Sequence, residues 1–211
     1  MYSMEIDKTF DLDEPASGLK LFGLTGGIGS GKSTVAKILE QNGYPVYYSD
    51  DRAKDIVNDN LELKEKIKTL LGDDSYTLQG EYNRKYVSEQ IFQNDDLRLA
   101  LNGLIHPAVK LDFEKWILNQ NSKIVFKETA LLFELKLNES CDKSVLVTAD
   151  DRVRMKRVMD RDNKTYRQVE TVMLKQMPEK EKCKLADYII YNNSTIEDLE
   201  LETQRFIEEI K

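Results

Sequence analysis

The 211-residue sequence predicts an α/β fold in which a parallel core sheet lies between layers of helices. Leu19–Leu24 is an apolar run of strand length that ends at a glycine-rich turn. Lys32–Gln41 then places its apolar residues on one face of a helix, which Asn42-Gly43 ends. Tyr44–Tyr48 is a second strand-like run. Strand, turn, helix and strand in this order form the repeating unit of parallel sheets.

Two helical excursions interrupt this sheet, near residues 55–118 and 150–183. In the first we expect helices at Leu61–Leu71, Arg84–Phe92 and Asp95–Asn119, around a turn region at Gly72–Gly80. In the second, Asp150 can cap a helix through Arg161, and Thr165 can start another through Met177. The remaining expected elements are strands at Ile124–Phe126, Ser144–Thr148 and Tyr188–Tyr191, and a closing helix at Ile196–Ile210.

The charge balance narrows the classes of partner. With 31 Lys and Arg against 38 Asp and Glu, the net charge is −7, so the long-range field repels nucleic acid and anionic membranes. We therefore expect neither as a partner, and no obligate protein partner is inferred. Cys141 and Cys183 follow no metal or redox spacing, which is typical of idle thiols in a reducing cytoplasm. Nothing in the sequence resembles a membrane span or a secretion signal.

The glycine-rich turn fits the phosphate-binding pattern G-x-x-x-x-G-K-[ST]. Backbone amides can point inward at an anion there, and the following helix aims its positive dipole end at the same place. The residues expected to bind ATP are Gly27, Gly29, Ser30, Gly31, Lys32, Ser33 and Thr34. Of these, Lys32 reaches the β- and γ-phosphates and Ser33 ligates Mg²⁺. The alternative is a glycine-rich turn that fits the pattern by chance.

Rival nucleotide-binding classes lack their second motif. Asn163-Lys164-Thr165-Tyr166 approaches the guanine-reading N-K-x-D but ends in tyrosine. Motor and transport ATPases carry an apolar strand ending in Asp-Glu, whereas Ile124–Phe126 is followed by Lys127-Glu128. A small-molecule phosphotransferase is therefore the favoured class.

A carboxylate and several arginines are the remaining candidates. Asp50 follows the second strand, where it could accept a hydroxyl proton or help to hold Mg²⁺. The alternative is that Asp50 is a loop or capping acid, although Asp51 could fill that role. Three arginines share one helix face: Arg154, Arg157 and Arg161. They either neutralise the γ-phosphate when a mobile segment closes over it, or form a solvated face paired with Asp160 and Asp162. His106, the only histidine, precedes a proline, which is typical of a structural turn or cap residue. Its spacing alone gives it no chemical role.

Together these segments resemble the dephospho-coenzyme A kinase family from about Leu19 to the C-terminal helix. The matching segments are Leu24–Thr34, Ser49-Asp50 with Ala53, Gln90–Phe92, Leu101-Asn102 with Ile105–Pro107, Leu131–Glu134, Arg157, Arg161, Gln176, Ala186–Ile190 and Asn192. The L-T-G-G-I-G-S-G-K-S-T form is much narrower than a general P-loop.

The resemblance implies transfer of the ATP γ-phosphate to the ribose 3′-hydroxyl of dephospho-coenzyme A, with Mg²⁺ as cofactor. It implies a P-loop three-layer α/β/α fold, with a helical coenzyme-binding insertion and a helical lid. The corresponding segments are an arm at 1–18, a core at 19–54, 119–149 and 184–211, an acceptor-binding subdomain at 55–118, and a lid at 150–183. It makes Asp50 the catalytic aspartate, Arg157 the lid arginine and Asn192 a residue near the adenine. Arg161 joins the nucleotide-binding set, and His106 the acceptor-binding set.

Three positions depart from the family pattern. Tyr48 stands where the family usually has the first aspartate of Asp-Ala-Asp, but Asp50 is retained. Lys54 replaces an arginine, and Ala130 replaces a proline before Leu131. These changes bear on acceptor binding. Another P-loop kinase of a small hydroxyl acceptor, or a nucleotide-dependent regulator with no acceptor, remain as alternatives.

Overall fold

The computed structural model describes residues 18–92 and 94–211. The expected arm at 1–18 lies, apart from Gly18, outside these residues. The described residues form two compact units, one made of residues 18–46 and 120–211 and the other of residues 47–92 and 94–119. The finer division into core, acceptor-binding subdomain and lid stays a prediction. Within the described part of the chain, no helix is both long and apolar enough to cross a bilayer.

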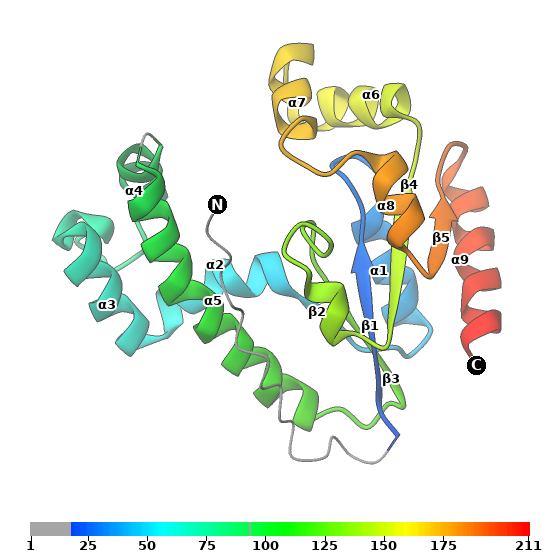
Figure 1. The fold of residues 1–211 in the computed structure, drawn as a ribbon, viewed down its shortest axis with the longest axis horizontal. Coiled ribbons are helices and arrows are strands. Elements are labelled where there is room, and N and C mark those ends of the chain that lie inside the picture. The colour runs from blue at the N-terminus through cyan, green and yellow to red at the C-terminus, as the bar shows by residue number, and fades with distance from the viewer. Residues whose placement is uncertain (1–17, 93) are drawn as a thin grey trace. The chain divides into compact units, whose positions relative to one another are not determined.

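A five-stranded sheet with strand order β2-β3-β1-β4-β5 forms the centre of the fold (Figure 1). Parallel pairing joins β1 to β3 and β4, and β4 to β5. The strands are β1 (Lys20–Thr25), β2 (Val46–Tyr48), β3 (Ile124–Glu128), β4 (Lys143–Thr148) and β5 (Tyr188–Tyr191). Central strands buried on both faces need continuous apolar runs, and five of the six β1 residues are buried. The predicted α/β fold with a parallel core sheet is confirmed.

Two helices of the first unit pack against each other and against the sheet. Helix α1 (Lys32–Gln41) and helix α9 (Ile196–Ile210) pack together, and α9 also contacts β5 (Figure 1). The buried apolar residues of α1 recur at helical spacing, which explains why this segment is a helix lying on the sheet. Three further helices follow β4: α6 (Asp151–Asp162), α7 (Tyr166–Met173) and α8 (Glu179–Leu185).

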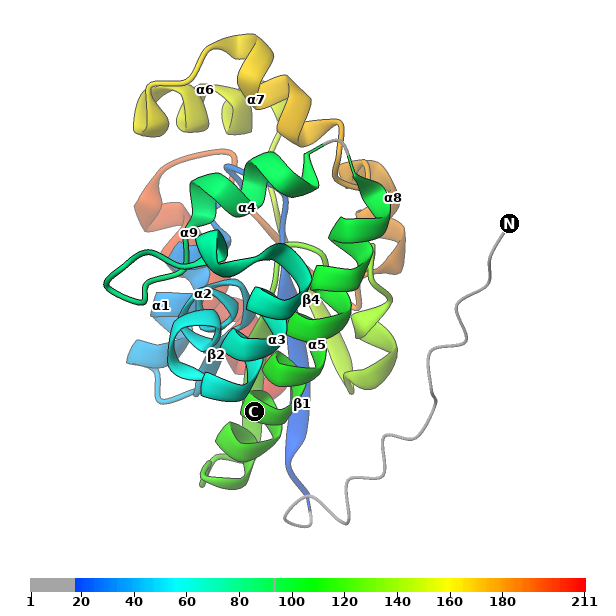
Figure 2. The same cartoon turned by 90° about the vertical axis from the view of Figure 1, so that its left-hand side faces the viewer.

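The second unit is helical and has its own apolar core. It contains α2 (Ser49–Asp59), α3 (Leu61–Leu71), α4 (Arg84–Ile91) and α5 (Asp95–Leu118). Figure 2 shows α3 beside α5, and the two helices contact each other. Buried apolar residues from all four helices form one cluster with Tyr76, whose hydroxyl donates to the Val57 carbonyl at 2.8 Å.

Most predicted elements agree with the structure, and three details were wrong. Thr165 does cap α7, through a reciprocal capping box, but the helix ends at Met173 instead of Met177. Asp150 stands at the N-cap position of α6 without a side-chain cap hydrogen bond, and the helix runs to Asp162. Helix α8 was not predicted, because its seven residues carry too few apolar positions to show a helical period.

Candidate nucleotide-binding and phosphotransfer site

The phosphate cradle is the loop Gly26–Gly31, which connects β1 to α1. Gly29 and Gly31 both have positive φ, 79° and 97°, a region that side chains with a Cβ rarely adopt. The Gly31 carbonyl accepts from the amides of Thr34 and Val35, which starts α1 directly behind the loop. The first-turn amides of α1 therefore face the loop and suit an anion.

Packing also requires glycine in this loop. A Cβ on Gly29 would lie 2.5 Å from the carbonyl oxygen of Arg154 in α6. A Cβ on Gly31 would overlap the side-chain amide of Asn192, which follows β5. Two segments distant in sequence therefore press on the cradle from outside and leave no room for larger residues.

Lys32 forms an ion pair with Glu128 at the end of β3. Both side chains are nearly buried, with exposed fractions of 12% and 7%. Glu128 pairs in register with Leu24 at the end of β1, because parallel strands end at the same edge of the sheet. Glu128 was not predicted as a site residue, because only an Asp-Glu pair was sought at the end of this strand. Its position after an apolar strand was the signal that could have identified it.

The oxygen donors near Lys32 suit a hard cation such as Mg²⁺. Ser33 is exposed in the first turn of α1, and Glu128 supplies a carboxylate beside Lys32. Within residues 18–92 and 94–211, no three His, Cys, Asp or Glu side chains are grouped as a ready metal site. One hydroxyl and one carboxylate fit Mg²⁺, which is usually bound by one or two protein oxygens together with substrate phosphates.

Arg157 and Asn192 are brought together beside the cradle. Arg157 donates to the Asn192 carbonyl at 2.9 Å, to its side-chain oxygen at 3.1 Å and to the Ser194 carbonyl at 3.3 Å. Asn192 in turn donates from Nδ2 to the Ser30 carbonyl at 2.8 Å. In this structure Arg157, the predicted lid arginine, is thus bound to the loop after β5. Arg161, whose side chain is 65% exposed, instead pairs with Asp162, as the solvated-face alternative describes.

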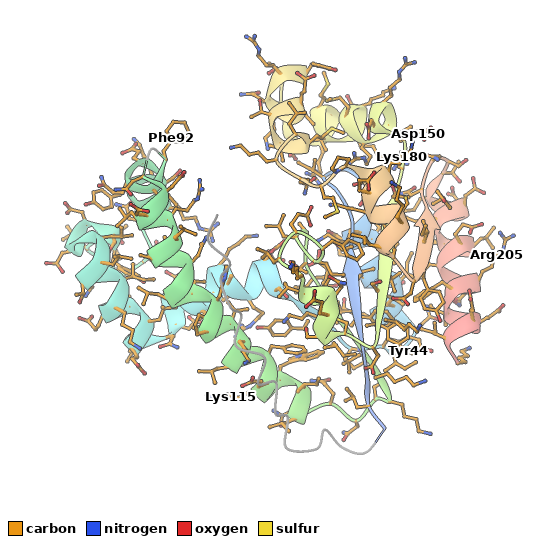
Figure 3. The ribbon with its side chains drawn as sticks, in the orientation of Figure 1. Tyr44, Phe92, Lys115, Asp150, Lys180 and Arg205 are labelled. Atoms are coloured by element: carbon orange, nitrogen blue, oxygen red, sulfur yellow. The ribbon has the colours of Figure 1, made fainter. Side chains whose placement is uncertain are left out.

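A buried polar network lies behind the cradle and was not expected from the sequence. The fully buried Lys182 of α8 lies 3.0 Å from Glu134 and 4.0 Å from Glu179. Glu179 accepts from the Thr148 hydroxyl at 2.6 Å and lies 3.5 Å from Arg154. In Figure 3, the labelled Asp150 and Lys180 mark the beginnings of α6 and α8, the helices that supply this network. Buried charges at α8 have no periodic signature, so single-sequence reasoning could not find them.

Asp50 and His106 belong to the second unit. Asp50 is exposed in the first turn of α2, while Asp51 forms an ion pair with Lys54 at 2.5 Å. His106 lies on α5, next to Pro107, and partial desolvation lowers the pKa of its imidazole. The catalytic role of Asp50 and the acceptor-binding role of His106 stay predictions.

The backbone around Asp50 is fixed by a charged hydrogen-bond network within that unit. Arg52 binds Asp112 of α5 with two hydrogen bonds, of 3.0 Å and 2.7 Å. The Tyr47 hydroxyl donates to the same carboxylate at 2.7 Å. The guanidinium holds the pKa of Asp112 below its usual range, and burial beside this carboxylate raises the pKa of Tyr47. Asp50 is therefore carried by a first turn that is anchored on both sides.

The parallel sheet, the cradle and the Lys32–Glu128 pair define a P-loop nucleotide-binding fold. A solved structure shares this fold: a shikimate kinase from Bacteroides thetaiotaomicron, 15% identical, matches with a TM-score of 0.51 over 91% of this chain and 98% of that one. The Thermus thermophilus protein TT1252 is more similar, with 31% identity and a TM-score of 0.81 over 92% of this chain and 98% of that one.

The family is also clear. The model of the family described as dephospho-CoA kinase matches residues 20–198, and the chain belongs to that family. The curated dephospho-CoA kinase of Fusobacterium nucleatum is 36% identical over 91% of this chain and 99% of its own length. The corresponding protein of Porphyromonas gingivalis is 38% identical over 81% of this chain and 84% of its length.

Proposed function

We propose that this chain transfers the γ-phosphoryl group of ATP to the ribose 3′-hydroxyl of dephospho-coenzyme A, the final step of coenzyme A biosynthesis. The cradle carries this proposal, since its glycine conformations and the Lys32–Glu128 pair lie in a chain that belongs to the dephospho-CoA kinase family. Family membership implies the use of ATP with a metal ion.

The cradle residues have chemical tasks in this reaction. The amides of Gly27–Gly31 and the start of α1 bind the phosphates, and Lys32 exchanges Glu128 for the β- and γ-phosphate oxygens. Ser33 would hold Mg²⁺, and Glu128, once released by Lys32, could support it. The ion, when bound, neutralises charge that develops on the phosphates.

Asp50 acts on the acceptor. It accepts the proton of the ribose 3′-hydroxyl as that oxygen forms its bond to the γ-phosphorus. The bond from the γ-phosphorus to the β,γ-bridging oxygen breaks, and ADP leaves with the electron pair. Arg157 neutralises the transferring group when it exchanges its bonds to Asn192 for phosphate oxygens. This exchange would have to accompany lid closure, because the guanidinium is engaged by carbonyl groups in the present structure.

The expected surroundings follow from the same proposal. The substrate is a small molecule, so the negatively charged chain needs neither nucleic acid nor membrane, and we infer no obligate protein partner. A cytoplasmic location matches the two thiols, which form no disulfide in the described part of the chain.

An acceptor panel distinguishes the proposal from its alternatives. ADP release is measured with Mg²⁺-ATP and dephospho-coenzyme A, shikimate, a nucleoside, or a nucleoside monophosphate. Release that depends on dephospho-coenzyme A and vanishes in Lys32→Ala supports the proposal. Release with another acceptor alone would identify a different small-molecule kinase. Tight ATP binding without acceptor-dependent release would favour a nucleotide-dependent regulator.

A further inference from the structure

Ile28 lies in the cradle between Gly27 and Gly29, and side chains from two distant segments bind both of its backbone polar groups. Its N–H donates to Oε1 of Gln176 at 3.0 Å. Its carbonyl oxygen accepts from Nη1 of Arg154 at 3.3 Å. The two peptide planes that flank Ile28 are thus bound from the segment that follows β4.

Arg154 is well placed to hold this position. It lies on α6 with 4% of its surface exposed, and its guanidinium is fixed by Asp151 at 2.7 Å and Glu179 at 3.5 Å. Its own backbone carbonyl contacts the Cα side of Gly29, so α6 lies directly on the loop. A planar guanidinium held by two carboxylates has little rotational freedom, so its contact with Ile28 is pre-formed.

The backbone beside Gln176 is also anchored. It follows α7 and precedes α8, and the N–H of the next residue, Met177, donates to Glu134 at 2.9 Å. Glu134 is in turn paired with the buried Lys182. The glutamine amide therefore reaches Ile28 from a fixed point, which Lys182 and Glu179 connect to Arg154.

The cradle needs such support because glycines leave its backbone loose. Each glycine orders at a larger entropic cost than other residues, and an anion site is effective when its amides already point at the ligand. Side chains that fix both peptide groups of Ile28 reduce the conformations that the neighbouring glycines can adopt. The support comes from the region expected to act as the lid, so cradle shape and lid position are coupled.

We propose that Gln176 and Arg154 are positioning residues for phosphoryl transfer, which hold the peptide groups of Ile28 and thereby set the cradle in its nucleotide-binding shape. The part of this inference that concerns transfer rests on the proposed function. The part that concerns ADP binding does not depend on the identity of the acceptor.

The test compares the full-length chain with Gln176→Met, which keeps the side-chain length and removes the acceptor oxygen. Gln168→Met is the matched control, because Gln168 caps α7 in the same region and its described hydrogen bonds stay within that cap. Three quantities are measured: the Kd of Mg²⁺-ADP, the kinetic constants with dephospho-coenzyme A, and the exchange rate of the Ile28 amide proton by NMR. Arg154→Lys is the second variant, since it keeps the charge beside Glu179 and loses the planar fork.

We expect Gln176→Met to weaken ADP binding by about five- to tenfold, the range of one net hydrogen bond. The kcat/KM for ATP should fall at least as much, the Ile28 amide should exchange faster, and the KM for dephospho-coenzyme A should stay within about twofold. Arg154→Lys should move the ADP affinity in the same direction, and Gln168→Met should leave it unchanged.

The two proposals fail in different ways. An unchanged ADP affinity together with an unchanged Ile28 exchange rate in Gln176→Met would overturn the positioning role. Equal losses in Gln176→Met and Gln168→Met would overturn it too, because they would reflect general loosening of the region. The wild-type chain could be inactive with dephospho-coenzyme A while Gln176→Met still shows the expected changes in ADP affinity and Ile28 exchange. That result would remove the proposed function and retain the positioning role.

Discussion

Lys182→Met should be among the most destabilising single substitutions in the first unit. The lysine side chain is fully buried, 3.0 Å from Glu134 and 4.0 Å from Glu179, whose side chains are only 16% and 12% exposed. Methionine preserves much of the volume but leaves the two carboxylates without this cation. Glu179 keeps the Thr148 hydroxyl and Arg154, so the main loss falls on Glu134.

The expected cost follows from the burial of the pair. Removing one partner of a buried ion pair costs about 3–5 kcal/mol, because the remaining charge is left uncompensated. The matched control is Lys184→Met on the same helix, whose lysine pairs with Glu181 at 2.8 Å while 61% exposed. That variant should change the free energy of unfolding by less than about 0.5 kcal/mol. The double variant Lys182→Met/Glu134→Gln should recover part of the loss, because it removes the stranded charge.

The assay must report on the first unit. Trp116, the only tryptophan, lies in the second unit, so its fluorescence would report the unfolding of that unit and not of the first. Urea-dependent hydrogen exchange of peptides from β4 and α9 gives the unfolding free energy of the first unit. A Lys182→Met variant within about 1 kcal/mol of wild type, or one no less stable than Lys184→Met, would refute the argument that this buried pair is needed.

Four further outcomes are expected. Lys32→Ala should nearly abolish transfer and weaken ATP binding while the fold persists, as kinetics, nucleotide titration and circular dichroism will show; normal turnover would exclude the cradle from the mechanism. Arg157→Ala should lower kcat more than ATP affinity, and equal losses would make it a ground-state binding residue. Asp50→Asn should lower turnover by about 10²–10⁴ with ATP affinity nearly unchanged, whereas near-normal turnover would exclude it as the base. Burial raises the pKa of Cys141 to about 11. Its alkylation at pH 8 should therefore be on the order of a hundredfold slower than that of a free thiol, and the alkylation rate should rise tenfold per pH unit. A plateau of the rate near pH 9 would contradict this.

The sheet and most helices were predictable because local signals and tertiary packing agree. The apolar run before Gly26 is the buried β1, and the helical face of Lys32–Gln41 is the buried face of α1. Leu61–Leu71 and Ile196–Ile210 also begin and end where capping residues and periodicity place them. By contrast, α8 is short and held by buried charges, so no hydrophobic period revealed it.

The site was predictable only where a motif fixes it. Spacing alone identified Lys32 and its neighbours, because the phosphate cradle needs those residue types in that order. Glu128, Arg154 and Gln176 come from other segments, and their relation to the cradle depends on where the chain returns to the sheet. Apart from the apolar strand that precedes Glu128, such contacts carry no local signature in one sequence. The charge run of α6 shows this well, since Arg154 is buried while Arg161 is exposed.

The most direct test of the central claim is the position of the new phosphate. Dephospho-coenzyme A and its 3′-deoxy analogue are incubated with Mg²⁺-ATP and the full-length chain, and the products are identified by mass spectrometry and ³¹P NMR. We predict a product one phosphoryl group heavier, with a new 3′-phosphomonoester signal, from the natural acceptor, and no product from the analogue. Phosphorylation of the 3′-deoxy analogue, or no reaction with either acceptor while ATP is bound, would contradict it.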